Sequence, residues 1–220
     1  MLLSMNVIEL FSSIDGEGKR QGFLTTFLRL HDCNIRCSYC DTLYSYGPES
    51  TFESMSVQAV ADVIEQLENH RITVTGGEPL LQEPAIIELI DELTRRNARY
   101  DFNIETNGTI IPSFHRDNVW FTYDYKTPSS LAEDAMNLDI FKVATPADII
   151  KFVVGSMQDL DRMNEILKIY PTDAQIFVSP VWGNIEGATI VEYMKAHNWQ
   201  NVRFQLQIHK FIWDPDAKGV

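Results

Sequence analysis

The sequence has little cysteine, little positive charge and no long apolar run. Only three of its 220 residues are cysteines, too few for a disulfide scaffold and suited to a reducing compartment. Eighteen basic against thirty-one acidic side chains give a net charge of -13, which argues against nucleic acid as a partner. No apolar stretch approaches the ~20 residues of a membrane span, and residues 1–11 lack the basic residues of a signal peptide. We therefore expect a cytoplasmic protein with no nucleic-acid or membrane partner.

Apolar residues make up 45% of the chain, which suits one globular domain over residues 1–220. Runs of β-branched and aromatic residues predict strands at 7–11, 23–30, 71–75, 101–105, 119–125, 149–154, 175–179 and 202–208. Helical spacing of apolar residues predicts helices at 56–70, around 86–93, at 158–170 and at 188–198. Alternating strands and helices indicate parallel βαβ units, but the connection from 105 to 119 is too short and polar for a helix. The expected fold class is α/β: an incomplete (partial) β/α barrel with shortened helical crossovers.

All three cysteines, Cys33, Cys37 and Cys40, lie within eight residues of one another, after the strand predicted at 23–30. A disulfide would use two thiols and strand the third. Three thiolates suit a 4Fe-4S cluster, because its fourth iron then stays open to a substrate or a second cofactor. A zinc ion held by the cysteines and His31 is the alternative.

Several polar or glycine-rich segments also follow predicted strands, at 76–79, 106–108, 126–130 and 179–182. Ligands gather at the carboxyl ends of parallel strands, so these segments predict a single active site. Three features stay ambiguous on the residues alone. The loop at 12–18 is either a tight turn or an edge laid against a flat ligand. Arg29 either reaches the surface or awaits an anion, and His209 is either a core histidine or a ligand contact.

The cysteine loop, with Tyr39 just before its last cysteine, and the segment Thr75-Gly-Gly-Glu-Pro79 resemble the motifs of radical S-adenosylmethionine (SAM) enzymes. The resemblance covers nearly the whole chain. It implies a 4Fe-4S cluster on the three cysteines and SAM on its open iron, generating a 5′-deoxyadenosyl radical that abstracts hydrogen from the substrate. The SAM-binding residues that it implies are Tyr39, Cys40, Asp41, Gly76, Gly77, Glu105, Asp124, Tyr125, Lys126, Ser179 and Pro180.

Within that superfamily, residues 11–18, 27–30, 40–42 and 207–210 resemble the 7-carboxy-7-deazaguanine synthase family. The resemblance implies a lyase that converts 6-carboxy-5,6,7,8-tetrahydropterin to 7-carboxy-7-deazaguanine with loss of ammonia, on the route to queuosine. It implies that Thr42 binds Mg2+, that the enzyme is a homodimer, and that flavodoxin or ferredoxin is its electron donor. The implied substrate-binding residues are Ile14, Asp15, Gly16, Glu17, Arg29, Thr75 and His209.

Two positions depart from the family pattern. Asp15 stands where the family has glutamine before Gly-Glu-Gly, and residues 123–126 replace a more usual Ser-Pro-Lys, so that only Lys126 matches. The alternatives are a radical SAM activase of a glycyl-radical partner protein and a non-catalytic Cys3His zinc module. The first predicts no activity on free pterin, and the second predicts bound zinc without iron–sulfur absorbance.

Overall fold

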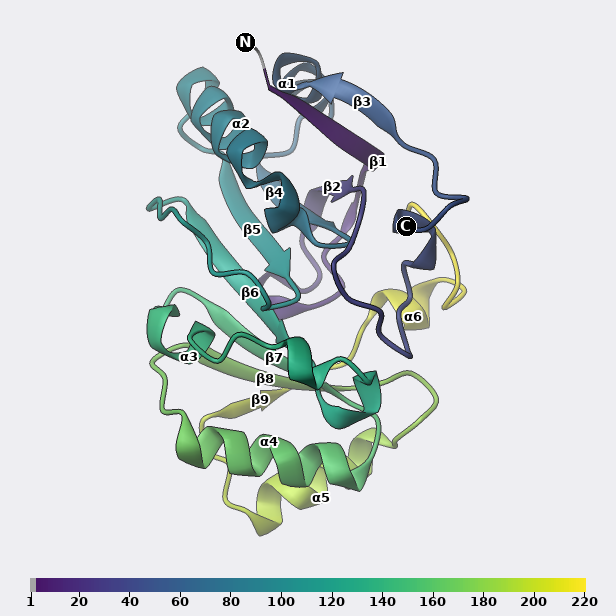
Figure 1. The fold of residues 1–220 in the computed structure, drawn as a ribbon, viewed down its shortest axis with the longest axis vertical. Helices are drawn as coiled ribbons and strands as arrows, with labels where there is room; N and C mark the ends of the chain where they lie inside the picture. The colour runs from purple at the N-terminus through teal and green to yellow at the C-terminus, as the bar shows by residue number, and fades with distance from the viewer. Residues whose placement is uncertain (1–2) are drawn as a thin grey trace.

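A computed structural model describes residues 3–220, which form one curved sheet of nine strands (Figure 1). The strand order is β3-β1-β2-β4-β5-β6-β7-β8-β9, parallel from β2 onward, with β1 antiparallel to both β2 and β3. The strands are β1 (Ser4–Ile14), β2 (Leu24–Leu30), β3 (Glu53–Ser56), β4 (Arg71–Gly76), β5 (Asp101–Thr106), β6 (Val119–Tyr125), β7 (Ile149–Val154), β8 (Gln175–Pro180) and β9 (Val202–Phe204).

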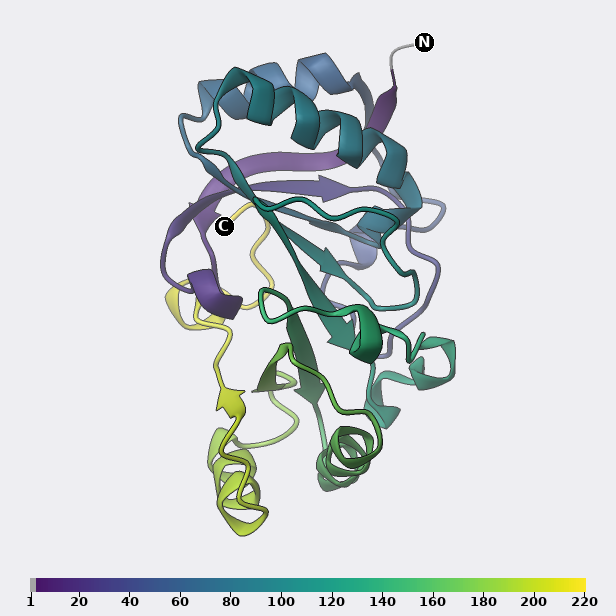
Figure 2. The same cartoon turned by 90° about the vertical axis from the view of Figure 1, so that its left-hand side faces the viewer.

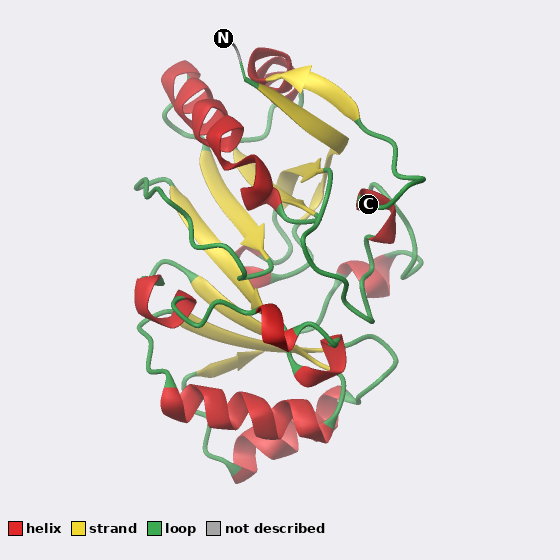
Figure 3. Ribbon diagram, in the orientation of Figure 1, coloured by secondary structure: helices red, strands yellow, loops and turns green. Residues whose placement is uncertain are grey.

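Four longer helices lie on the outside of the curved sheet, and the C-terminal segment lies on its inside (Figures 1 and 2). The α-helices are α1 (Val57–Gln66), α2 (Glu83–Arg96), α3 (Ile140–Val143), α4 (Met157–Ile169), α5 (Gly187–Ala196) and α6 (His209–Ile212). Five 3-10 turns, η1 (Gly18–Arg20), η2 (Leu43–Ser45), η3 (Pro79–Gln82), η4 (Pro128–Ser130) and η5 (Glu133–Ala135), lie between these elements (Figure 3). No helix of the described residues is long and apolar enough to cross a membrane.

Local sequence signals explain where the covering helices begin. Ser56 accepts a hydrogen bond from the Ala59 amide at 3.2 Å and caps α1, and Ser156 accepts one from the Asp159 amide at 3.3 Å and caps α4. A serine in this position satisfies an amide that the first helical turn leaves free. The buried side of α1 then carries Val57, Val60, Ala61 and Ile64, all fully buried.

The predicted open, mostly parallel α/β architecture is confirmed. The strands predicted at 119–125 and 149–154 match β6 and β7 to the residue, and the segment between β5 and β6 contains no helix. The prediction at 202–208 is wrong beyond Phe204. There the chain leaves the sheet, and the Ile208 amide donates to the Gly16 carbonyl at 3.1 Å instead. The first strand is also longer than predicted, and β3 was not predicted.

Candidate active site

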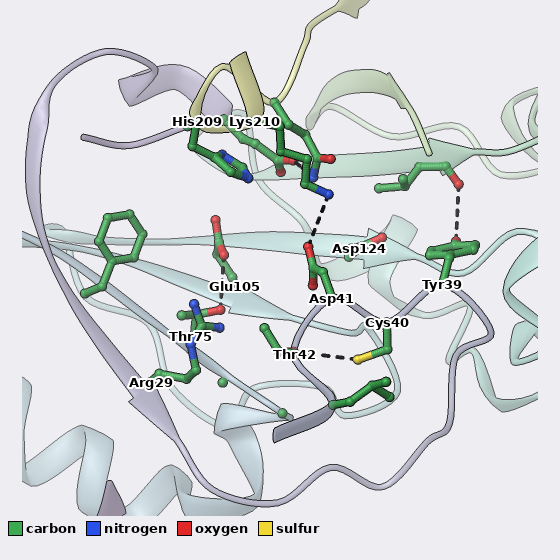
Figure 4. Close-up of a pocket in the computed structure, with 18 of the residues that line it drawn as sticks. Arg29, Tyr39, Cys40, Asp41, Thr42, Thr75, Glu105, Asp124, His209 and Lys210 are labelled. Atoms are coloured by element: carbon green, nitrogen blue, oxygen red, sulfur yellow. Dashed lines mark hydrogen bonds and ion pairs between the residues drawn. The ribbon is translucent and has the colours of Figure 1, made fainter. Parts of the chain in front are cut away.

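The carboxyl ends of the strands surround a cavity of about 610 Å³, which the cysteine loop and the C-terminal residues 214–220 also line (Figure 4). This is the edge of an open parallel sheet at which ligands bind. The sequence-predicted site residues that line it are Ile14, Asp15, Gly16, Glu17, Arg29, Cys33, Cys37, Tyr39, Cys40, Asp41, Thr42, Thr75, Gly76, Gly77, Glu105, Asp124, Lys126 and His209.

Three predicted SAM contacts, Tyr125, Ser179 and Pro180, do not line the cavity. Side chains alternate along a strand, so Asp124 faces the cavity and Tyr125 faces the helical layer. There the Tyr125 hydroxyl donates to Glu133 at 2.7 Å and its ring packs on Phe152. Ser179 is fully buried within β8, and its hydroxyl has no partner among residues 3–220. Pro180 is the last residue of the same strand.

The three cysteines are free, half-buried thiols that line the cavity together. Burial raises the pKa of Cys33 and of Cys37. His31 is not part of the lining: its ring packs on Phe52, with the two ring centroids 4.3 Å apart. Within residues 3–220, no three His, Cys, Asp or Glu side chains are placed to hold a single metal ion.

The glycine pair after β4 supports the start of the cysteine loop. The Gly77 amide donates to the Leu30 carbonyl at 3.2 Å, and the Glu78 amide donates to the Asp32 carbonyl at 2.7 Å. A Cβ on Gly77 would lie 2.0 Å from the Asp32 carbonyl oxygen, and one on Gly76 would lie 2.3 Å from the Leu30 carbonyl oxygen. Only glycine allows so close a backbone approach. These two residues therefore place backbone, and no side chain, between the cavity and the cysteine loop.

Glu78 is a structural residue of the site that sequence reasoning missed. It is fully buried, and burial raises its pKa. Its carboxylate accepts hydrogen bonds from the Leu80 amide at 2.9 Å, the Thr106 hydroxyl at 2.8 Å and the Asn107 amide at 2.7 Å. Asn107 in turn places its side-chain nitrogen 3.7 Å from the sulfur of Cys33. The sequence signal that could have identified this residue is its place as the only acid in Gly-Gly-Glu-Pro. The proline that follows has no N–H, so the carboxylate must accept from amides further along the chain.

Arg29 is neither a surface residue nor an unpaired cation. Its side chain is 15% exposed, and its Nε donates to Glu9 Oε1 at 2.6 Å. The Tyr44 hydroxyl donates to the same oxygen at 2.7 Å. The other guanidinium nitrogens make no hydrogen bond to residues 3–220, and the side chain lines the cavity. Glu9 and Tyr44 thus fix the arginine and leave the end of its fork free for a carboxylate.

A second buried cation, Lys151 on β7, was also missed, although it is the only charged residue in an apolar strand. It is 8% exposed and lies 2.5 Å from Glu17 Oε2 and 3.7 Å from Asp124 Oδ2. Burial opposes its charge, but Glu17 and Asp124 outweigh burial and raise the pKa of Lys151. Gln207 donates to the other oxygen of Glu17. Lys151 therefore ties the loop after β1 to the middle of the sheet.

The model of the Radical SAM superfamily matches residues 29–153. The chain is 37% identical to the 7-carboxy-7-deazaguanine synthase of Clostridium acetobutylicum, over 99% of this chain and 100% of that protein. It is 36% identical to the protein of the same name from Methanospirillum hungatei, over 96% of this chain and 86% of that one. The chain belongs to the 7-carboxy-7-deazaguanine synthase family of radical SAM enzymes.

The fold is shared with a solved structure. The crystal structure of QueE from Escherichia coli superposes with a TM-score of 0.69 and 23% identity, covering 92% of this chain and 93% of that chain. As a radical SAM enzyme, the protein uses SAM and a 4Fe-4S cluster. The convergence of Cys33, Cys37 and Cys40 on one cavity, beside the glycine pair, fits both groups.

The C-terminal segment, from His209 onward, packs against both the loop after β1 and the cysteine loop. His209 packs so closely on the loop after β1 that a Cβ on Gly16 would lie 1.9 Å from its Nδ1. Burial lowers the pKa of His209. Lys210 Nζ lies 3.7 Å from Asp41 Oδ2 and joins this segment to the cysteine loop (Figure 4). Tyr39 donates to the Val153 carbonyl at 3.3 Å, and burial raises its pKa to about 12.

Proposed function

We propose that the protein converts 6-carboxy-5,6,7,8-tetrahydropterin to 7-carboxy-7-deazaguanine with loss of ammonia, in the pathway to queuosine. One observation carries the proposal beyond the family name. The three thiols share a single cavity with the free end of the Arg29 fork and with the loop at 14–17. A cofactor on the cluster and a carboxylated heterocycle would therefore meet in one enclosed space.

The cofactor side of the cavity is the edge formed by the cysteines, the glycine pair and the ends of β5 and β6. When bound, the cluster and SAM supply one-electron chemistry that abstracts hydrogen from the substrate. Cys33, Cys37 and Cys40 would hold the cluster, and the backbone of Gly76 and Gly77 would face the methionine end of SAM. Lys126, which lies 3.0 Å from Asp124, would hold that carboxylate in place beside the cofactor. Family resemblance supports these roles, and the shared cavity is consistent with them.

The substrate side is the opposite wall. Arg29 would clamp the substrate carboxylate with the nitrogens that Glu9 leaves free. Glu17 and the Gly16 backbone would contact the N–H edge of the pterin, because a carboxylate offers acceptors only. The Thr75 hydroxyl, which donates to Glu105 Oε2 at 3.1 Å, and His209 would complete the wall. Residues 214–220 line the cavity and would shield the reaction from water.

Four further features complete the proposal, and the first three rest on family resemblance. Thr42 would contribute one oxygen ligand to Mg2+, a hard cation that keeps several of its waters. Its hydroxyl lies 3.7 Å from the sulfur of Cys40, beside the proposed cluster. The reducing electron would come from a flavodoxin or a ferredoxin, and the enzyme would act as a homodimer. Residues 1–220 would form one radical SAM domain.

An anaerobic turnover assay tests the proposal. The protein is reconstituted with iron and sulfide, reduced, and supplied with SAM and 6-carboxytetrahydropterin. The expected result is the deazaguanine chromophore with one ammonia per product, increased by Mg2+ and abolished in Cys37→Ser. Cleavage of SAM to 5′-deoxyadenosine without pterin turnover would refute the substrate while leaving the radical chemistry in place. Activation of a glycyl-radical partner without pterin turnover would support the activase instead.

A further inference from the structure

Asp15 is an acid of the cavity wall that is buried and makes few polar contacts. It follows directly after β1, and its backbone is fixed on both sides. Its amide donates to the Phe23 carbonyl at 2.8 Å, and its carbonyl accepts from the Gly22 amide at 2.8 Å. The residue is 2% exposed, yet it lines the cavity. Its carboxyl group therefore cannot turn out to solvent.

The carboxyl group lacks the partners that a buried carboxylate needs. Oδ2 accepts one hydrogen bond, from the Thr73 hydroxyl at 3.2 Å. Oδ1 has no hydrogen-bond partner, and neither oxygen has an ion-pair partner, among residues 3–220. Arg20, the cation that acts on Asp15, is 3.0 Å from Asp101 and donates to the Ile72 carbonyl at 3.2 Å instead. Removing an ionised carboxylate from water without a paired cation is costly, so such a group takes up a proton.

Like charges add to this cost. Glu105 on β5 and Glu17 in the same loop both act on Asp15, and Glu17 is itself ion-paired with Lys151. Burial first, and then Glu105, raise the pKa of Asp15 to about 7, against the opposing effects of Arg20 and the Thr73 hydroxyl. Burial raises the pKa of Glu105 as well, but there Lys151 and Arg29 oppose it. Asp15 therefore holds a proton up to about pH 7, where an exposed aspartate is ionised.

We propose that Asp15 acts as a neutral carboxylic acid and that its free Oδ1 donates a hydrogen bond to an acceptor on the edge of the substrate ring. The inference rests on the proposed function, because it takes the substrate to be a pterin. Since Oδ2 accepts from Thr73, the proton belongs on Oδ1, which has no protein partner. A neutral acid also accepts, so it matches a lactam edge, where C=O and N–H lie side by side. Glu17, paired with Lys151, offers acceptors only.

The first test is a binding titration of the cluster-loaded protein under nitrogen, from pH 6 to 9, with fluorescent 6-carboxypterin as the probe. Only the protonated protein is competent, so its Kd should rise about tenfold per pH unit above 7 and about a hundredfold by pH 9. In Asp15→Asn, whose amide always carries a donor, this contribution to the rise should be absent, so that the ratio of the two Kd values changes with pH. Titration of the probe itself is common to both proteins and cancels in the comparison. Asp117→Asn, an exposed acid outside the cavity, should follow the unmodified protein.

The second test needs no ligand. Infrared difference spectra between pH 6 and 8 should show a protonated carboxyl stretch that disappears at pH 8 and is absent from Asp15→Asn. Glu105→Gln removes a like charge and should move this transition to lower pH. Identical pH profiles for the unmodified protein and Asp15→Asn in both tests would overturn the proposal. If the infrared signal is present but no variant binds the pterin, the donor role and the proposed substrate both fail. If pterin turnover is normal but the signal is missing, only the inference about Asp15 fails.

Discussion

Replacing Asp15 by asparagine should stabilise the protein at neutral and alkaline pH. The folded state holds a proton on Asp15 up to a pKa of about 7, whereas the unfolded chain releases it near 3.8. Between these values the folded state binds more protons, so the stability of the unmodified protein falls as pH rises through this window. The amide of Asp15→Asn does not titrate. The variant and the unmodified protein should therefore be equally stable near pH 4 and should diverge up to about pH 7.

The size of the difference follows from the same shift. From 3.8 to about 7 is about three pKa units, and each unit is worth ~1.4 kcal/mol, so ionised Asp15 costs the folded state on the order of 4 kcal/mol. For a chain of 220 residues this corresponds to about 8–16 °C in Tm. Loss of the single hydrogen bond from Thr73 would reduce the gain by about 1 kcal/mol at most.

Thermal unfolding of the reconstituted protein, followed under nitrogen at pH 4, 5.5, 7 and 8.5, measures this difference. Asp117→Asn controls for the removal of one negative charge from an acidic protein, and its Tm should follow that of the unmodified protein at every pH. A Tm difference between Asp15→Asn and the unmodified protein that does not change with pH would refute the reasoning. So would a variant that is less stable at pH 8.5, because that would mean the buried carboxylate is stabilised by partners that the structure does not give it.

Three other substitutions test the residues that support the cavity wall and the cysteine loop. Lys151→Met leaves Glu17 buried without its cation and should lower the free energy of unfolding by about 3–5 kcal/mol, measured as a lower Tm. The double variant with Glu17→Gln should recover most of this stability. Glu78→Gln places an amide NH2 against a backbone N–H and should cost about 1–3 kcal/mol and lower the iron retained per chain; unchanged iron content would contradict its role beside the cysteine loop. Gly77→Ala should lose the cluster because its Cβ would meet the Asp32 carbonyl at 2.0 Å, whereas Gly155→Ala, with contacts no closer than 3.4 Å, should keep it; equal iron content in both would contradict this.

The parallel part of the fold was predicted well, because its strands are short runs rich in β-branched and aromatic residues, and polar segments or helices with apolar spacing separate them. The strand at 149–154 is buried over its whole length and was placed to the residue. The segment at 202–208 alternates as a strand should, yet pairing with β8 ends at Phe204. Beyond it, Gln207 donates to Glu17, and the Ile208 amide donates to the Gly16 carbonyl. Contacts between residues about 190 apart override the local pattern, and periodicity contains no information about them.

In the site, too, local sequence patterns were predictable and contacts between distant residues were not. Most predicted site residues line the cavity because the strand ends bring them to one edge, but Tyr125, Ser179 and Pro180 do not, and the partners of the lining residues were missed. Arg29 illustrates this, since the sequence left open whether it was a surface residue or an unpaired cation. In the sheet, Glu9 and Arg29 lie opposite each other in the antiparallel register of β1 and β2. Both residues lie in predicted strands, but the sequence does not show that these two strands pair, nor in which register.

The charges of the cavity wall connect Asp15 to Arg29. Glu17 and Asp124 are both paired with Lys151, which neutralises much of their negative charge. Arg29 is already in contact with Glu9. An ionised, unpaired Asp15 in the same cavity would repel any carboxylated ligand that approaches this arginine, and in a partly buried site such repulsion is weakly screened. A proton on Asp15 removes that repulsion and adds a donor at the same time. The acid at this position is therefore compatible with an anionic substrate only because the protein keeps it buried, without an ion-pair partner and under the influence of Glu105.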